Sequence, residues 1–292
     1  KVRKSRSERE LLNLGELFKA FHRYGGRLLW KIVIGKIRIS EGQMMKKKVL
    51  VFYGLNLLIT VFFALLFGGI LGSIGGNEMM LGLLVVLGVQ LSPFVTTMIF
   101  RKIYKQKMEY TYEFNKYSII ACVLPIFLVV ISAFVLSLSG ISYVKTEFKG
   151  TILIVAILTT LIGAYTEEFG WRGCLLHIIE TEHTPFVSSL FVGMLWGIWH
   201  FIKISSVGIV GFLLFIPTIM LFSVLMTYIF HKSNKSLVNM VVFHSFINLT
   251  NIFMIYNREG KALYVALFSV QSAVIFLIFL NDRSYFRLKT NQ

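Results

Sequence analysis

Ionisable and amide side chains interrupt three of the long apolar runs of this chain. They are Glu167, Glu168 and Arg172 in TEEFGWRG, His200 in MLWGIWHF, and His244 and Asn248 in VVFHSFINL. A charged side chain at the centre of a bilayer costs about 2.5 to 3.5 kcal/mol on insertion scales. Polar residues inside apolar runs are therefore candidates for function.

The spacing of these residues determines which of them can act together. Glu168 and Arg172 lie four residues apart with the acid first, so they can pair on one face of a helix. Glu167 then points elsewhere. His244 and Asn248 are also four apart and present an imidazole and an amide on one face to a neighbouring helix.

This set of groups suits hydrolysis by an activated water molecule. Burial strengthens a carboxylate as a base, so Glu167 can take a proton from water and return it to a leaving amine. We expect His200 to orient the water and share its proton. His244 and Asn248 can donate hydrogen bonds to the oxyanion, and such donors contribute roughly 3 to 4 kcal/mol each in other hydrolases.

Other interpretations of the same residues stay open at this point. A carboxylate and two histidines can bind zinc, although the chain has no HExxH helix, so we predict no cofactor and keep zinc as the alternative. Ser245 adjoins His244 and points about 100° away from it, so a nucleophilic pair is disfavoured. A purely structural role is also available to each group: an ion pair for Glu168, a backbone carbonyl partner for His200, and interhelical hydrogen bonds for His244.

Eight apolar runs carry these residues or accompany them, each near the roughly 20 residues that cross a bilayer. They cover about 49–74, 79–100, 117–139, 150–166, 186–203, 208–230, 236–255 and 261–281. Because lipid offers the backbone no hydrogen-bonding partner, runs of this length must be helices. The sequence predicts an all-α, polytopic transmembrane helix bundle of about eight spans.

The helical rise of about 1.5 Å per residue places the polar groups at similar depths. If the fourth helix continues to near Glu180, Glu167 lies about 20 Å from its cytoplasmic end. Counted from Phe186, His200 lies at about 21 Å. Counted from Ser236, His244 lies at about 12 Å and Asn248 at about 18 Å. The continuation of the fourth helix is therefore a prediction in its own right.

Composition and charge agree with a membrane protein. Of the 292 residues, 56% are hydrophobic, too many for a soluble domain. The formal net charge of +16 lies outside the apolar runs, so the expected partner is a bilayer with anionic headgroups and not nucleic acid. Basic residues before the first run, at 101–116 and at 283–292 predict a multi-pass protein of the cell membrane with both termini in the cytoplasm.

The sequence divides into three parts. Residues 1–48 form a basic N-terminal segment, which is either an interfacial helix or an extension. Residues 49–282 form one intramembrane domain. Residues 283–292 form a short basic cytoplasmic tail.

In its polar motifs the chain resembles the CPBP family of CAAX-protease and bacteriocin-processing (Abi-type) proteins, which includes the type II CAAX prenyl endopeptidases. The family's EExxxR motif stands at 167–172. Its motif of an aromatic residue followed by xxxH stands at 196–200, with Trp where many members have Phe, and its HxxxN motif stands at 244–248. The resemblance covers about residues 45–280.

The resemblance implies an intramembrane endopeptidase of the glutamate-dependent rather than the metal-dependent type. It implies Glu167 as the catalytic base, assisted by His200, with His244 and Asn248 at the oxyanion site. The rest of the first motif, Glu168 with its arginine partner, is implied as support. The implied substrate is a membrane-associated or lipidated peptide or protein. Processing of prenylated CAAX proteins and bacteriocin-related functions are both known roles of the family.

Two other functions compete with peptide hydrolysis. A non-catalytic bacteriocin-immunity or scaffold protein would keep the polar cluster as a binding site, but it would not need all six groups. A proton-coupled transporter would also use buried Glu and His, but it would normally show repeated halves with broken helices. The endopeptidase is therefore the favoured prediction.

Overall fold

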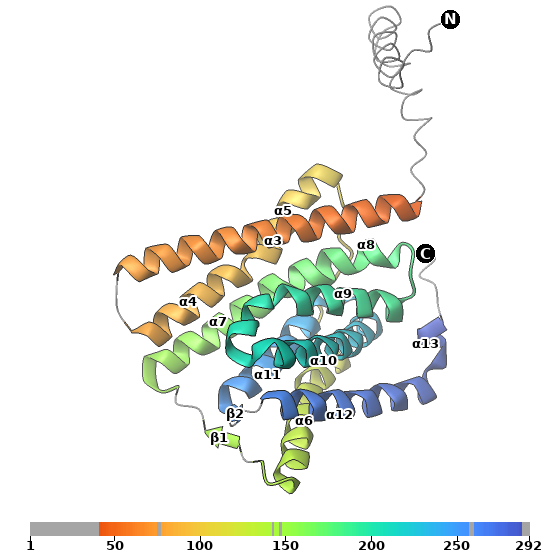
Figure 1. The fold of residues 1–292 in the computed structure, drawn as a ribbon. Coiled ribbons are helices and arrows are strands. Elements are labelled where there is room, and N and C mark those ends of the chain that lie inside the picture. The colour runs from red at the N-terminus through yellow and green to blue at the C-terminus, as the bar shows by residue number, and fades with distance from the viewer. Residues whose placement is uncertain (1–40, 75–76, 142, 146–147, 257–259, 288–292) are drawn as a thin grey trace, which may run out of the picture. The chain divides into compact units, whose positions relative to one another are not determined.

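Helices make up nearly all of the computed structural model, which describes residues 41–74, 77–141, 143–145, 148–256 and 260–287 (Figure 1). In chain order they are α3 (Glu41–Ile74), α4 (Glu78–Gln90), α5 (Ser92–Tyr104), α6 (Lys116–Leu138), α7 (Gly150–Gly170), η1 (Trp171–Leu175), α8 (Leu176–Glu180), α9 (Pro185–Trp199), η2 (Phe201–Lys203), α10 (Ile204–Lys232), α11 (Leu237–Phe253), α12 (Gly260–Asn281) and α13 (Arg283–Arg287). Residues 1–44 and 45–292 form separate units. Most of the predicted N-terminal segment lies outside the described residues, and its last residues begin α3.

The eight predicted apolar runs are helical over nearly all of their length, so the all-α prediction is confirmed. The run at 79–100 is divided at Leu91 into two helices, and the run at 236–255 ends in a short strand. Among the described residues, six helical stretches are long and apolar enough to cross a membrane: α3, α4 with α5, α6, α7 through α8, α10 with η2, and α12. Helices α9 and α11 are apolar but shorter. The chain is a multi-pass helical membrane protein, while the count of eight spans and the side of the termini stay predictions.

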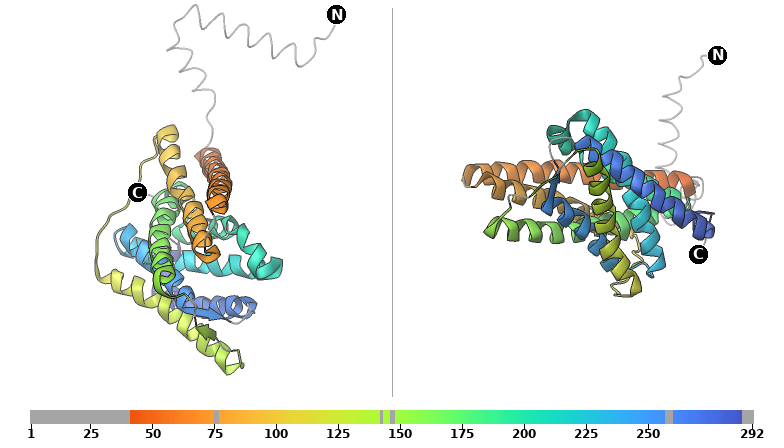
Figure 2. Two further views of the ribbon diagram at one scale, coloured as in Figure 1. Left: turned by 90° about the vertical axis from the view of Figure 1, so that its left-hand side faces the viewer. Right: turned by 90° about the horizontal axis from the view of Figure 1, so that it is seen from below.

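The fourth predicted helix continues without a break to Glu180, as its polar residues require. It comprises α7, a π-helical segment at η1, and α8. The wider π turn accommodates an extra residue, and such turns are frequent at functional sites. Trp171, Arg172 and Cys174 are all fully buried there, so this stretch packs on every side. Helix α7 contacts α4, α5 and α11 (Figure 2).

Helices α9 and α10 form a tight hairpin because two glycines leave room between them. A Cβ atom at Gly193 would lie 2.6 Å from the Cα of Met220, and one at Gly197 would lie 3.3 Å from the Cα of Ile216. Small residues four apart allow helix backbones to approach closely in membranes. The turn of the hairpin begins at His200, the residue after α9, and continues through η2.

A short strand pair is the one described element outside the helical pattern. Strand β1 (Tyr143–Lys145) pairs antiparallel with β2 (Met254–Tyr256). The pair joins the connection before α7 to the end of α11, and the apolar runs gave no signal for it.

Candidate active site

Three helices meet at the carboxylate of Glu167. This residue lies in the last turn of α7 and is 1% exposed. Its Oε1 accepts a hydrogen bond from Nε2 of Gln90 at 3.1 Å, and its Oε2 accepts one from the indole Nε1 of Trp196 at 2.8 Å. Gln90 is the last residue of α4, and Trp196 belongs to α9. Each oxygen is thus held by a neutral donor, without a cation.

A glycine on α7 makes room for one of these donors. A Cβ atom at Gly163, one turn before Glu167, would overlap the amide group of Gln90. The polar end of Gln90 therefore lies directly against the backbone of α7. This close approach fixes where its amide can point.

Glu168 has a different environment from the carboxylate next to it. Nη1 of Arg172 lies 2.9 Å from both of its carboxylate oxygens, and this ion pair is fully buried. Nδ1 of His244, on α11, lies 2.8 Å from Oε1 of Glu168. The carboxylate of Glu168 is therefore engaged by both a guanidinium and an imidazole.

The ring of His200, which follows α9 directly, is hydrogen-bonded to the backbone of that helix. Its Nδ1 lies 2.8 Å from the backbone oxygen of Trp196. Because a carbonyl oxygen can only accept, this nitrogen carries the proton, and Nε2 of the neutral ring keeps its lone pair. The aromatic rings of Trp196, Trp199 and Phe215 surround the imidazole at centroid distances of 4.9 to 5.9 Å.

Trp196 is the residue that contacts most of the set. Beyond its bonds to Glu167 and His200, its ring lies 4.7 Å below the guanidinium of Arg172. The ring of His244 stands edge-on to it at 5.0 Å. One indole therefore contacts the carboxylate of Glu167, both histidines and the guanidinium that pairs with Glu168.

The described geometry places the predicted site residues close together. The ion pair of Glu168 with Arg172 is present as the spacing indicated. The direct partners of Glu167 are Gln90 and Trp196, and His244 bonds to Glu168, while the role of His200 at the water stays a prediction.

Asn248 follows His244 by one turn of α11 and is half-buried. Nothing in the described part of the chain is recorded as its hydrogen-bonding partner. Its amide is therefore free to donate to a ligand. The described residues contain no group of three His, Cys, Asp or Glu placed to hold a metal ion.

Sequence reasoning gave no role to Gln90 and treated Trp196 only as an aromatic motif position. Both are uncharged, so a search for ionisable residues passes over them. An amide in the middle of the apolar run at 79–100 is the signal that could have drawn attention to Gln90.

Fold and site together define a class: a multi-pass helical membrane protein with two adjacent buried glutamates and two histidines around one tryptophan. Comparison with known proteins supports the resemblance seen in the motifs. Residues 149–250 match the family described as type II CAAX prenyl endopeptidase Rce1-like, and all three motifs lie inside this range. In this segment the chain is similar to CPBP-family proteins.

Similarity to curated relatives is distant but extends beyond the motifs. CAAX prenyl protease 2 of Methanococcus maripaludis is 26% identical over 152 residues, which cover 47% of this chain and 56% of the relative. Lysostaphin resistance protein A of Staphylococcus haemolyticus is 22% identical over 166 residues, covering 56% and 45%. The same-named protein of Staphylococcus epidermidis is 22% identical over 203 residues, covering 65% and 52%. The chain spans about half the length of the curated relatives it matches.

Proposed function

We propose that this chain is an intramembrane endopeptidase in which Glu167 activates a water molecule to hydrolyse a peptide bond. One observation carries the proposal: two neighbouring buried carboxylates have different partners. Glu168 is paired with Arg172 and His244, whereas the hydrogen bonds that Glu167 accepts from the described residues come from neutral N–H donors. A base must have a lone pair that no cation occupies, and Glu167 meets that condition.

The remaining groups supply the other parts of a hydrolytic mechanism. Glu167 takes a proton as the water oxygen bonds to the scissile carbonyl carbon, and the lone pair on Nε2 of His200 accepts a hydrogen bond from the same water. His244 and Asn248 donate to the oxyanion that forms. When the C–N bond breaks, Glu167 returns the proton to the leaving amine.

One proton is enough to make the four buried ionisable groups of the site electrically neutral. Glu167, Glu168, Arg172 and His244 are all buried. With both carboxylates and the guanidinium ionised, the four groups carry one net negative charge, which is costly inside a membrane. Nδ1 of His244 already donates to Glu168, so a proton on its Nε2 makes the set neutral, leaves Glu167 ionised as the base and supplies the N–H that His244 donates to the oxyanion.

The proposed substrate is a membrane-associated or lipidated peptide. A relative named as a CAAX prenyl protease makes a prenylated CAAX peptide the first candidate. The relatives named for lysostaphin resistance support a second candidate function, in which a bacterial membrane protein uses the same residues as a binding site in resistance or immunity. No cofactor is part of the proposal, and zinc is the alternative that a chelator tests.

The test is cleavage of peptides by the purified chain reconstituted in lipid. The peptide set includes prenylated, non-prenylated and leader-type sequences, and the products are identified by mass spectrometry. Cleavage by the wild type and not by Glu167→Gln supports the proposal. Specific binding of a peptide by both proteins without cleavage by either would favour the non-catalytic function instead.

A further inference from the structure

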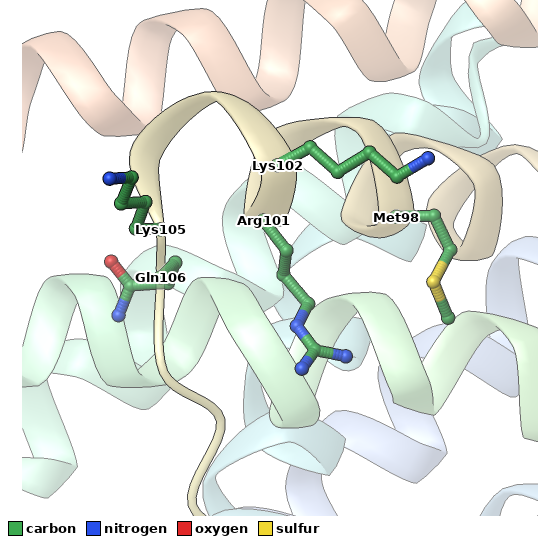
Figure 3. Close-up of a pocket in the computed structure, with 5 residues that line it drawn as sticks. All are labelled: Met98, Arg101, Lys102, Lys105 and Gln106. Atoms are coloured by element: carbon green, nitrogen blue, oxygen red, sulfur yellow. The ribbon is translucent and has the colours of Figure 1, made fainter.

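An open hollow of 390 Å³ lies at the end of α5, outside the set of residues around Glu167. It is lined by Met98, Arg101, Lys102, Lys105 and Gln106. Figure 3 shows Arg101 between the Lys105 and Gln106 side chains on one side and those of Lys102 and Met98 on the other. Three of the five lining residues are cations, and none is an acid.

These cations lack the acidic partners that other basic residues have. Lys232 lies 2.6 Å from Asp282 and Lys235 lies 2.8 Å from Glu109, but across the described ranges no acid forms an ion pair with the three cations of the hollow. The C-terminal end of a helix carries only about half a negative charge, so α5 balances a small part of three positive charges. The hollow is therefore suited to an anion.

The backbone after α5 shapes the hollow. Lys105 ends the helix in the left-handed conformation at φ 49°, which turns the chain back past Arg101. Gln106 is then fixed by a hydrogen bond from Nζ of Lys48 at 3.1 Å. Lys48 belongs to α3, so a fourth cation from a second helix lies beside the hollow.

The position of the hollow indicates a lipid rather than a free anion. The stretch Glu78–Tyr104 has 27 residues. That is about 40 Å of helix, whereas the hydrocarbon core of a bilayer is about 30 Å thick. The last turns of α5 thus reach the headgroup layer. Ile99 and Ile103 are 38% and 62% exposed on these same turns, next to Lys102, where acyl chains would contact them.

We propose that this hollow binds the phosphate of an anionic phospholipid headgroup, with the acyl chains along the exposed isoleucines. Arg101 supplies a planar fork of donors that matches phosphate oxygens, and the lysines add point charges. The site does not depend on the proposed peptidase activity. It would hold the end of α5, which packs on α7, at a fixed depth.

Native mass spectrometry of the purified protein in neutral detergent, titrated with phosphatidylglycerol, tests the proposal. The variant combines Arg101→Gln, Lys102→Gln and Lys105→Gln. Its matched control combines Lys116→Gln, Lys149→Gln and Arg283→Gln, which remove the same charge from exposed cations outside the hollow. We expect affinity to fall about 100-fold in the first, about 3 kcal/mol, and less than about tenfold in the control.

Equal losses in the two triple variants would overturn the site, because net charge alone would then explain binding. No preference of the wild type for phosphatidylglycerol over phosphatidylcholine would overturn it as well. Inorganic phosphate is expected not to compete; if it binds as tightly as the lipid, the lipid assignment is wrong. Should the triple variant fail to fold, Lys102→Gln alone is expected to weaken binding about fivefold.

Discussion

The indole N–H of Trp196 donates a 2.8 Å hydrogen bond to Oε2 of Glu167, and this bond joins α9 to α7 at the buried carboxylate. Trp196→Phe keeps an aromatic ring and removes the N–H donor together with part of the ring surface that contacts Arg172 and His244. A hydrogen bond to a charged group is worth about 1.5 to 3 kcal/mol, so we expect the rate of cleavage to fall about 10- to 100-fold. Single-turnover cleavage of a bound peptide measures the effect.

The same helix offers a matched control for this substitution. Trp199 donates its indole N–H to Oγ1 of Thr60 at 2.7 Å and packs edge-on to the ring of His200 at 4.9 Å. Because Phe keeps an aromatic ring beside His200, Trp199→Phe should lower stability with a smaller loss in rate than Trp196→Phe. Equal losses of rate in the two variants would show that the bond to Glu167 has no special role.

Gln90 holds the other oxygen of Glu167, so its amide should matter for the rate. Gln90→Met keeps the length and removes the donor, and we expect about a tenfold lower rate. Gln271→Met is the control, because Gln271 is buried on α12 and neither amide atom has a hydrogen-bonding partner among the residues that the structure describes. Its replacement should therefore be neutral or stabilising. A normal rate in Gln90→Met would remove Gln90 from the site.

The two adjacent glutamates should differ in their effect on stability. Glu168→Gln leaves Arg172 as a buried charge without its counterion, which costs about 3 to 5 kcal/mol. Glu167→Gln breaks no ion pair and should change the free energy of unfolding far less. Unfolding in detergent micelles measures both. Combining Glu168→Gln with Arg172→Met should recover part of the loss, and failure to recover any would argue against the pair.

Gly193 should tolerate no larger side chain, because α9 and α10 touch there. The Cβ of Gly193→Ala would lie 2.6 Å from the Cα of Met220, so we expect a loss of about 1 to 3 kcal/mol. Gly82→Ala on α4 is the control, since a Cβ there meets nothing within 4 Å. A neutral effect of Gly193→Ala on the unfolding temperature would contradict the tight hairpin.

Acid should weaken the contact between the ends of α10 and α12. A hydrogen bond from Lys232 lowers the pKa of Asp282 below its ordinary value. A lowered folded-state pKa means that the contribution is present at neutral pH and is lost as pH falls through that pKa. The pair is near the surface, so we expect no more than about 1 kcal/mol. Asp282→Asn should abolish this part of the pH dependence of unfolding, and an unchanged profile would exclude it.

Apolar runs predicted the helices because their length in lipid leaves no other structure for the backbone. Spacing along one helix predicted the pair of Glu168 with Arg172. Spacing cannot give the rotation of one helix against another, so the partners of Glu167 and His244 were not predictable. The π-helical segment at η1 and the closeness of Gly163 to Gln90 likewise depend on packing between distant segments.

The most direct test of the central claim is the cleavage rate of Glu167→Gln relative to wild type, with and without a chelator, in samples of equal unfolding temperature. General base catalysis contributes typically about 10²- to 10⁴-fold. The account predicts a loss of at least that size in Glu167→Gln and no effect of the chelator on the wild type. Cleavage that survives Glu167→Gln, or that the chelator abolishes, would contradict it.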